Sequence, residues 1–192
     1  MTASDSDISL IEAARAGDLV AFSTIVQRYE GKVGATIVGM LGNIPESDDV
    51  AQEVFIRFYK SIHKFEGRSQ LGTYLTRIAI NQCLSHIEKK KRKRWLNRFK
   101  SEDESMILNI PDRGLSATEK DTQAAVQSAL LNLEPDFRSV VVLRMLEGYS
   151  TEETAKMLGL PKGTVLSRLA RGQKKLRIIM EKMGLSVVGQ RS

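Results

Sequence analysis

The sequence predicts an all-α protein of two small helical domains joined by a flexible linker, and three observations support this prediction. Apolar residues recur every three or four positions over most of the chain. No stretch alternates between apolar and polar residues for long enough to form a sheet. An acidic segment with few apolar residues, which contains Pro111 and Gly114, interrupts the helical pattern. We therefore place the domains at residues 8–96 and 119–184 and the linker at residues 97–118.

The first predicted domain contains three helices. The earliest follows a break at Gly17, and the second follows Pro45, where Ser47 and Asp48 are typical of a helix entry. A turn at residues 67–69 separates the second helix from the third. The apolar positions at helical spacing are Ala21, Ile25 and Tyr29 in the first helix, Val50, Val54, Phe58, Ile62 and Phe65 in the second, and Leu71, Leu75, Ile78 and Ile87 in the third.

The second predicted domain ends in a helix-turn-helix motif. Ser150 and Glu153 form a capping box, so a helix begins near Thr151, and it ends by Gly159. Pro161 suits the first turn of the next helix, where no amide hydrogen is needed. The apolar residues that would lock the two helices together are Ala155, Leu158, Leu160, Val165 and Leu169. Two earlier helices carry Val126, Leu130 and Leu133 and, after Pro135, Val140, Leu143 and Leu146.

The net charge of +6 is distributed unevenly along the chain. Eight bases and one acid give +7 over residues 88–100, whereas six acids and two bases give −4 over residues 101–121. Seven bases and one acid give +6 over residues 162–182. Two basic segments separated by an acidic one favour contact with a polyanion at two places, and nucleic acid is the expected partner.

The sequence excludes several classes of protein. Its longest aliphatic run, Val140–Leu143, is far shorter than the roughly 18 residues of a membrane-spanning helix, so we expect no membrane insertion. The N-terminal residues lack the pattern of a secretory signal, which favours a cytoplasmic protein. One cysteine, Cys83, and two histidines offer no metal centre. Because no phosphate-binding loop or nucleophile motif is present either, we expect no cofactor and no enzymatic activity.

Three groups of residues are candidate binding sites. Thr164, Ser167, Arg168 and Arg171 share one face of the last helix and could read DNA, although an ordinary helical hairpin also exposes a basic face. The basic run 89–94 ends a helix, where the helix dipole favours cations even without a ligand. The acidic cluster Glu46, Asp48, Asp49 and Glu53 surrounds a helix start, where acids are stabilising, and it also suits a protein partner.

The order and spacing of these motifs resemble those of the extracytoplasmic-function sigma factors, from about residue 8 to residue 183. Residues 48–55 (DDVAQEVF), 65–69 (FEGRS) and 74–81 (YLTRIAIN) resemble region 2 of that family. Residues 133–135 (LEP), 141–144 (VVLR), 147–150 (EGYS), 163–165 (GTV) and 167–169 (SRL) resemble region 4. The resemblance implies a bacterial RNA polymerase subunit that directs promoter-specific transcription initiation.

The resemblance also implies roles for individual residues and for partners. Core polymerase, through its clamp coiled coil, would contact Asp48, Asp49, Gln52, Glu53 and Phe55. The minus-ten element, melted with one base flipped out, would contact Phe65, Arg68, Ser69, Tyr74, Arg77, Asn81, Lys89, Lys90, Lys91 and Arg92. The minus-thirty-five duplex would contact Thr164, Ser167, Arg168, Arg171, Lys174 and Lys175. The polymerase flap and an anti-sigma factor are further partners that the family implies.

Three positions depart from the family pattern. Tyr74 stands where Trp is usual, Leu166 where Lys or Arg is common, and Gly172 where Ala is usual. The main alternative to the sigma hypothesis is a free-standing helix-turn-helix regulator, which would bind a two-fold symmetric operator as a dimer. An RNA-binding module is disfavoured because no sheet with surface aromatic residues is predicted.

Overall fold

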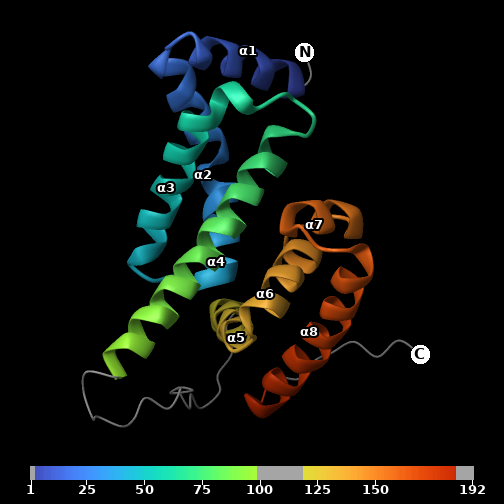
Figure 1. The fold of residues 1–192 in the computed structure, drawn as a ribbon. Helices are drawn as coiled ribbons and strands as arrows, with labels where there is room; N and C mark the ends of the chain where they lie inside the picture. The colour runs from blue at the N-terminus through green and yellow to red at the C-terminus, as the bar shows by residue number, and fades with distance from the viewer. Residues whose placement is uncertain (1–2, 99–118, 185–192) are drawn as a thin grey trace.

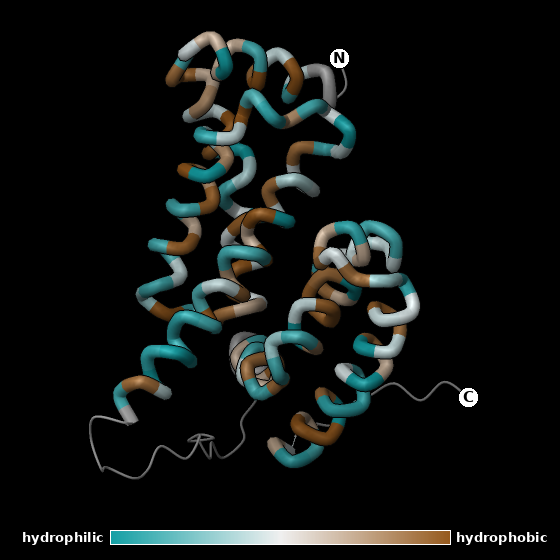
Figure 2. Tube along the Cα trace, viewed as in Figure 1, coloured by the Kyte–Doolittle hydropathy of each residue, from teal (hydrophilic) through white to brown (hydrophobic). Residues whose placement is uncertain are grey.

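The prediction of an all-α fold is confirmed. The computed structural model describes residues 3–98 and 119–184, and every regular element within these ranges is helical (Figure 1). Apolar residues lie on the sides of the helices that face one another, and polar residues lie outside (Figure 2). The linker predicted at residues 97–118 lies outside the described residues, except for its first two positions, which continue a helix.

The first half of the chain is a helical bundle of α1 (Ala3–Arg15), α2 (Leu19–Leu41), α3 (Glu46–Ser61) and α4 (Leu71–Arg98). Asp18 caps α2, because its Oδ1 accepts hydrogen bonds from the amides of Val20 and Ala21 at 2.8 and 3.1 Å. A 3₁₀ turn, η1 (Ile62–Lys64), ends α3. The apolar pattern that predicted three helices missed α1, although Ile11 and Ala14 anchor it in the core.

The second half contains α5 (Glu119–Leu131), α6 (Pro135–Val141), a π-helical turn η2 (Val142–Leu146), α7 (Thr151–Leu158) and α8 (Lys162–Lys182). The predicted capping box of α7 is present, with Ser150 accepting from the amide of Glu153 at 3.2 Å and the Glu153 carboxylate accepting from the amide of Ser150 at 2.8 Å. Gly159 ends α7 with a φ of 64°. Pro161 is the N-cap of α8, one residue before the predicted position.

The two halves pack against each other, with α2 contacting α5, η2 and α6, and α4 contacting α6 and α7 (Figure 1). Four buried residues of the second half join the core of the first, namely Val142, Leu143, Tyr149 and Met157. The Tyr149 hydroxyl and the Oγ1 of Thr76 are 3.1 Å apart and buried. The Thr36 hydroxyl donates to Glu147 at 3.0 Å. The two halves are therefore docked in this structure through apolar and hydrogen-bonded contacts.

Arg138 lies at the centre of this contact. Its side chain is buried, and its guanidinium donates to the Met40 carbonyl of α2 at 2.5 Å and to the Leu133 carbonyl at 2.7 Å. It also donates to the Leu131 carbonyl at the end of α5. Met40 and Leu131 lie in the last turns of α2 and α5, where carbonyls lack partners within the helix, and Leu133 lies in the turn before α6, so Arg138 satisfies carbonyls on both sides of the contact.

Cys83 is buried in the core of the first half. Burial raises the pKa of its thiol to about 12, so the thiol is protonated and unreactive at neutral pH. No helix in the described ranges meets the length and apolarity needed to cross a bilayer.

Gly172 shows why one departure from the family pattern is tolerated. A Cβ at this position would lie 2.9 Å from Val141 Cγ2 and 3.4 Å from Phe137 Cβ, because α8 closely approaches α6. We expect Gly172→Ala to lower the free energy of unfolding, since overpacking costs about 1–3 kcal/mol and exceeds the gain of up to ~1 kcal/mol in helix propensity. Thermal unfolding measures the change.

Gly163→Ala is the matched control for Gly172→Ala. A Cβ at Gly163, which is also in α8, meets nothing within 4 Å. This variant is expected to keep or raise the melting temperature. A melting temperature of Gly172→Ala at or above that of the unaltered chain would contradict the packing explanation.

Candidate nucleic-acid interface

The acidic cluster lies on the exposed face of α3. Asp48, Asp49 and Gln52 are exposed at its N-terminal end. Glu53 is partly exposed and forms an ion pair with Arg57 at 2.8 Å. Glu46 pairs with Lys90 of α4 at 3.2 Å, so the acidic cluster and the basic run of α4 touch. The free acidic surface is therefore formed mainly by two aspartates.

Two aromatic or apolar residues on α3 extend this surface, whereas one predicted residue does not. Ile56 and Tyr59 are 44% and 41% exposed and follow Asp49 and Gln52 at helical spacing. Phe55, in contrast, is only 8% exposed and points into the core. Phe55 can thus affect the binding of a partner only by fixing the position of α3. The alternation of exposed acidic and apolar positions along α3 could have revealed Ile56 and Tyr59.

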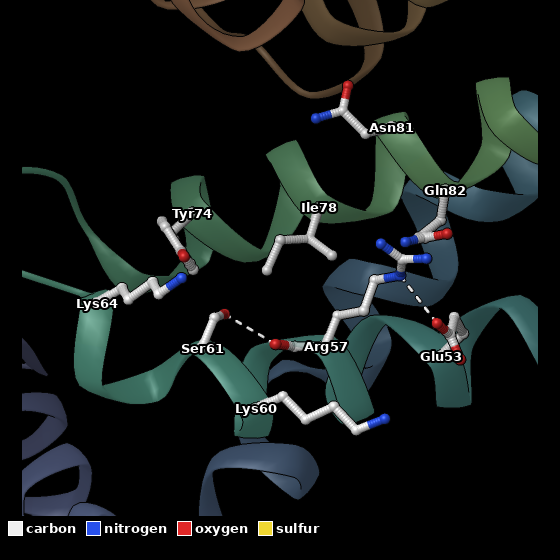
Figure 3. A pocket seen from close by; sticks show the side chains of 9 residues that line it. All are labelled: Glu53, Arg57, Lys60, Ser61, Lys64, Tyr74, Ile78, Asn81 and Gln82. Atoms are coloured by element: carbon white, nitrogen blue, oxygen red, sulfur yellow. Dashed lines mark hydrogen bonds and ion pairs between the residues drawn. The ribbon is translucent and has the colours of Figure 1, made fainter.

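An open groove of about 530 Å³ lies between α3 and α4 (Figure 3). Two predicted minus-ten residues of α4, Tyr74 and Asn81, line it. Three cations that the sequence analysis missed line it too, namely Arg57, Lys60 and Lys64. The full lining is Glu53, Arg57, Lys60, Ser61, Lys64, Tyr74, Ile78, Asn81 and Gln82. The sequence motifs considered on α3 were its apolar positions and the acids of its N-terminal half, whereas Arg57 and Lys60 lie in its C-terminal half and Lys64 lies in η1.

Tyr74 is the aromatic centre of this region. Its ring makes an edge contact with the ring of Phe65, with 5.0 Å between the two centroids, and the Arg77 guanidinium lies 5.6 Å from the centroid of the Tyr74 ring. Tyr74 is partly buried and Arg77 is exposed, so one side of the pair is accessible. Phe65 is only 6% exposed and supports the ring of Tyr74 from below rather than forming surface itself. An aromatic ring beside cations is the chemistry that stacks bases and holds phosphates.

The loop between η1 and α4 contains two further predicted minus-ten residues. Arg68 and Ser69 are exposed, as are all residues from 66 to 70. Arg68 forms an ion pair with Glu66 at 2.5 Å, but the two side chains are 86% and 60% exposed, so the pair contributes little to stability. Gly67 has a φ of 70°, which gives the loop its sharp turn.

The basic run continues α4 beyond Asn81. Lys89, Lys91 and Arg92 are exposed on this helix, whereas Lys90 is engaged by Glu46. Because α4 is one helix from Leu71 to Arg98, the aromatic pair and the basic run share one rigid element. The bases of a single strand can therefore stack at the aromatic pair, and its phosphates further along can contact the cations of the same helix.

The helix-turn-helix is formed as predicted by α7 and α8. Its small core contains Val140, Ala155 and Val165, with Leu158, Leu160 and Leu169 packed against it. An ion pair also joins the two helices of the motif, since Lys162 of α8 lies 3.0 Å from Glu152 of α7. Hydrogen bonding from Lys162 and Lys156 lowers the pKa of Glu152, so these contacts persist as pH falls toward that lowered pKa.

The predicted reading face of α8 is only partly free. Ser167, Arg171 and Lys174 are exposed, and Thr164 is half-buried. Arg168 is 27% exposed and pairs with Asp136 at 2.8 Å. Lys175 pairs with Glu134 and lies 4.9 Å from the centroid of the Phe137 ring. Arg168 and Lys175 therefore tie α8 to α6 and its N-cap in this structure, while Arg171 and Lys174 face solvent.

Comparisons with known proteins agree with this geometry. Residues 25–93 match the family described as sigma-70 region 2, and residues 123–176 match the family described as sigma-70, region 4. The chain is 33% identical over 175 residues to the ECF RNA polymerase sigma factor SigW of Bacillus subtilis, with 87% of this chain and 92% of SigW covered. It is 32% identical over 181 residues to the RNA polymerase sigma-H factor of Pseudomonas aeruginosa, with 90% and 93% covered.

Two solved structures have a similar fold. CnrH, solved in complex with the cytosolic domain of CnrY, is 26% identical with a TM-score of 0.63, and 93% of this chain and 99% of that chain are covered. The sigma factor RpoE of Bartonella quintana, solved with the anti-sigma factor NepR, is 21% identical with a TM-score of 0.64, and 83% and 96% are covered.

The fold and the ordered pair of regions define a sigma factor of RNA polymerase. The chain belongs to the extracytoplasmic-function sigma factors of the sigma-70 family. It is thus a factor that directs promoter-specific transcription initiation, and the hypothesis of a free-standing regulator is not favoured. Sigma factors are known as non-catalytic initiation factors.

Proposed function

We propose that this chain uses three separate surfaces in promoter recognition. The exposed acidic face of α3 binds the clamp coiled coil of core polymerase, the groove and exposed face of α4 bind the melted minus-ten strand, and the exposed face of α8 binds the minus-thirty-five duplex. The observation that supports this division most directly is that the exposed acids Asp48 and Asp49 lie at the N-terminal end of α3, on a different helix from the exposed bases of α4 and of α8. Each surface suits a partner of opposite charge. The acidic surface suits a basic protein surface, and the two basic surfaces suit the phosphates of DNA.

The minus-ten surface combines the two properties that single-strand capture requires. Extrusion of a base costs a few kcal/mol of unstacking, which an aromatic platform and phosphate contacts offset. Tyr74 offers the platform, with Arg77 beside it. Lys60 and Lys64 bring positive charge to the groove, where Glu53 pairs with Arg57, and the exposed cations of the basic run continue it along α4. Tyr74 has a smaller face than the Trp common in this family, so it stacks with less area.

The proposed promoter contacts require the two halves to separate. Elements named minus ten and minus thirty-five lie about 25 base pairs apart, which is roughly 85 Å of duplex. A compact chain of 192 residues has a radius of gyration of only about 16 Å. The segment 99–118 adds at most about 70 Å of reach if extended. The docked arrangement is therefore one state of the chain, and promoter binding requires an open one.

Reconstituted transcription tests the proposal. Core polymerase transcribes fragmented genomic DNA with and without the chain, and the new RNA 5′ ends locate the promoters that depend on it. We expect a shared pair of upstream elements at these start sites. Tight binding of the chain alone to a symmetric duplex site, with no new start sites on addition of core, would support the regulator hypothesis instead.

Arg171→Ala tests the assignment of α8. Arg171 is exposed on the face of α8 that is not tied to α6, so its loss removes one cationic contact to the duplex. We expect transcription from promoters with a minus-thirty-five element to fall by about tenfold, while affinity for core polymerase is unchanged, since a good base contact contributes about 1–3 kcal/mol. Arg177→Ala, an exposed arginine further along α8, is the control. Equal loss of core binding would refute the division of roles.

Two further partners complete the proposal. The family resemblance implies an anti-sigma factor that would bind when the sigma factor is inactive, and the flap of core polymerase would contact the second half of the chain. Pull-down of the chain with the flap domain alone tests the second contact. A flap domain that retains the first half of the chain but not the second would contradict this contact.

A further inference from the structure

Arg15 connects α1 to the segment that follows α3. It is in the last turn of α1, which lies before the first residue matched to sigma-70 region 2. Its Nε donates to the Ile62 carbonyl at 3.1 Å, and its Nη2 donates to the Phe65 carbonyl. The contact spans about fifty positions in sequence and is partly buried. One guanidinium therefore holds two points of the chain between α3 and α4.

The two carbonyls mark the beginning and end of the 3₁₀ turn η1. Ile62 is the C-cap of α3, and Phe65 is the residue at which the backbone leaves η1 in an extended conformation, with φ −78° and ψ 107°. The planar guanidinium presents its donors in a fixed fork, so it fixes both the distance and the direction between these carbonyls. Arg15 thereby fixes where the exposed loop 66–70 begins.

The loop that follows Phe65 is held at its two ends. Residues 66–70 are exposed, and the Arg68–Glu66 ion pair lies within the loop. At its far end, the Gln70 carbonyl accepts from the Tyr74 amide at 3.1 Å at the start of α4. The near end is held by Arg15 and by the packing of Phe65 against Tyr74. The loop position thus depends on α1, an element outside the groove.

We propose that Arg15 is a positioning residue for promoter opening. It holds the carbonyl of Phe65 so that Phe65 supports Tyr74 and the loop 66–70 stands over the aromatic end of α4, where a flipped base would bind. Arg15 touches neither DNA nor polymerase. This inference rests on the proposed role of the loop and α4 in binding the minus-ten strand, and it extends the functional unit to α1.

A second arginine separates positioning of the loop from attachment of α1. Arg28 of α2 pairs with Asp7 of α1 at 2.5 Å, and the Tyr29 hydroxyl also donates to Asp7. Arg28→Ala removes one contact of α1 with α2 but alters no donor or acceptor of the Arg15 contacts, and the Tyr29 hydroxyl still joins Asp7 to α2. If α1 acts only as structural support, Arg28→Ala and Arg15→Ala have equal effects. If Arg15 positions the loop, only Arg15→Ala affects promoter opening.

The experiment uses holoenzyme reconstituted from core polymerase and the full chain, on a promoter fragment mapped with the unaltered protein. Permanganate reactivity of unpaired thymines in the minus-ten element reports opening, and hydrogen exchange of amides 65–70 reports the loop. For Arg15→Ala we expect about tenfold less opening and faster exchange in the loop, with core affinity within twofold of the unaltered chain. Arg15→Lys retains the charge and one donor group, and it is expected to restore opening partly.

The possible outcomes separate the inference from the function on which it rests. If Arg15→Ala opens the promoter as well as the unaltered chain does, or if Arg28→Ala reduces opening equally, the positioning role is wrong. If Arg15→Ala does not fold, the comparison of Arg15→Lys with Arg28→Ala decides in the same way. If the unaltered holoenzyme binds the promoter but leaves its minus-ten thymines unreactive, the proposed role of α4 is wrong instead.

Discussion

Asp49→Arg is expected to weaken the association of the chain with core polymerase by at least about tenfold. Asp49 is exposed in the first turn of α3, and Glu53 and Glu46 are already paired with Arg57 and Lys90. The negative charge available to a basic partner is thus concentrated in Asp49 and its neighbour Asp48. Charge reversal replaces an attraction with a repulsion, and like charges brought together at an interface cost several kcal/mol. Fluorescence anisotropy with labelled chain and core polymerase measures the change.

The control for Asp49→Arg is Glu30→Arg. Glu30 is exposed on α2 and outside the acidic cluster, so the variant makes the same change in net charge on the same half of the chain. Its core affinity is expected to stay within twofold of the unaltered chain at 0.15 M salt, where the Debye length is about 8 Å. If both variants lose affinity equally, the effect is one of net charge, and α3 is not the docking helix.

Gly39→Leu is expected to separate the two halves of the chain. Gly39 lies on the face of α2 that meets η2, and a Cβ there would already lie 3.2 Å from Val142 Cγ1 and 3.7 Å from Leu146 Cδ1. The three further carbons of leucine have no space in the docked arrangement. Within α2 the substitution favours the helix by up to about 1 kcal/mol, so the first half stays folded. Small-angle X-ray scattering is expected to show a larger radius of gyration for the free chain.

Gly31→Leu is the matched control for the wedge at Gly39. Gly31 is also in α2, and a Cβ there meets nothing within 4 Å. The radius of gyration of this variant is expected to equal that of the unaltered chain. Unchanged scattering for Gly39→Leu would show that α2 and η2 are not in contact in solution. Because promoter binding requires the open state, Gly39→Leu is also expected to bind core polymerase at least as tightly as the unaltered chain.

Local signals in the sequence were sufficient for the helix-turn-helix. The capping box of Ser150 and Glu153, Gly159 and Pro161 predicted both ends of α7 and the start of α8 to within one residue. These signals work because helix ends are determined by a few neighbouring backbone and side-chain groups. The apolar spacing predicted α3 and α4 because it records which side of each helix is buried, but it also placed Ile62 and Phe65 in the same helix as Phe58, whereas α3 ends at Ser61.

The accessibility of individual site residues could not be predicted in this way. Phe55 and Phe65 match family motifs but are buried, and Arg168 and Lys175 are engaged by Asp136 and Glu134. Family motifs include residues that position a surface as well as those that form it. Whether a motif residue is buried or exposed depends on the neighbours that the fold brings to it, and those neighbours are distant in sequence.

The sequence by itself determined the helical class, the helix-turn-helix, the order of the two regions and the uneven distribution of charge. The tertiary structure alone decided that the halves dock through Arg138 and Tyr149, that α1 reaches the loop through Arg15, and that Gly172 permits α8 to approach α6. Each of these features joins residues far apart in the chain. Helical periodicity and capping record only local preferences, so contacts between distant segments become visible only when the helices are packed.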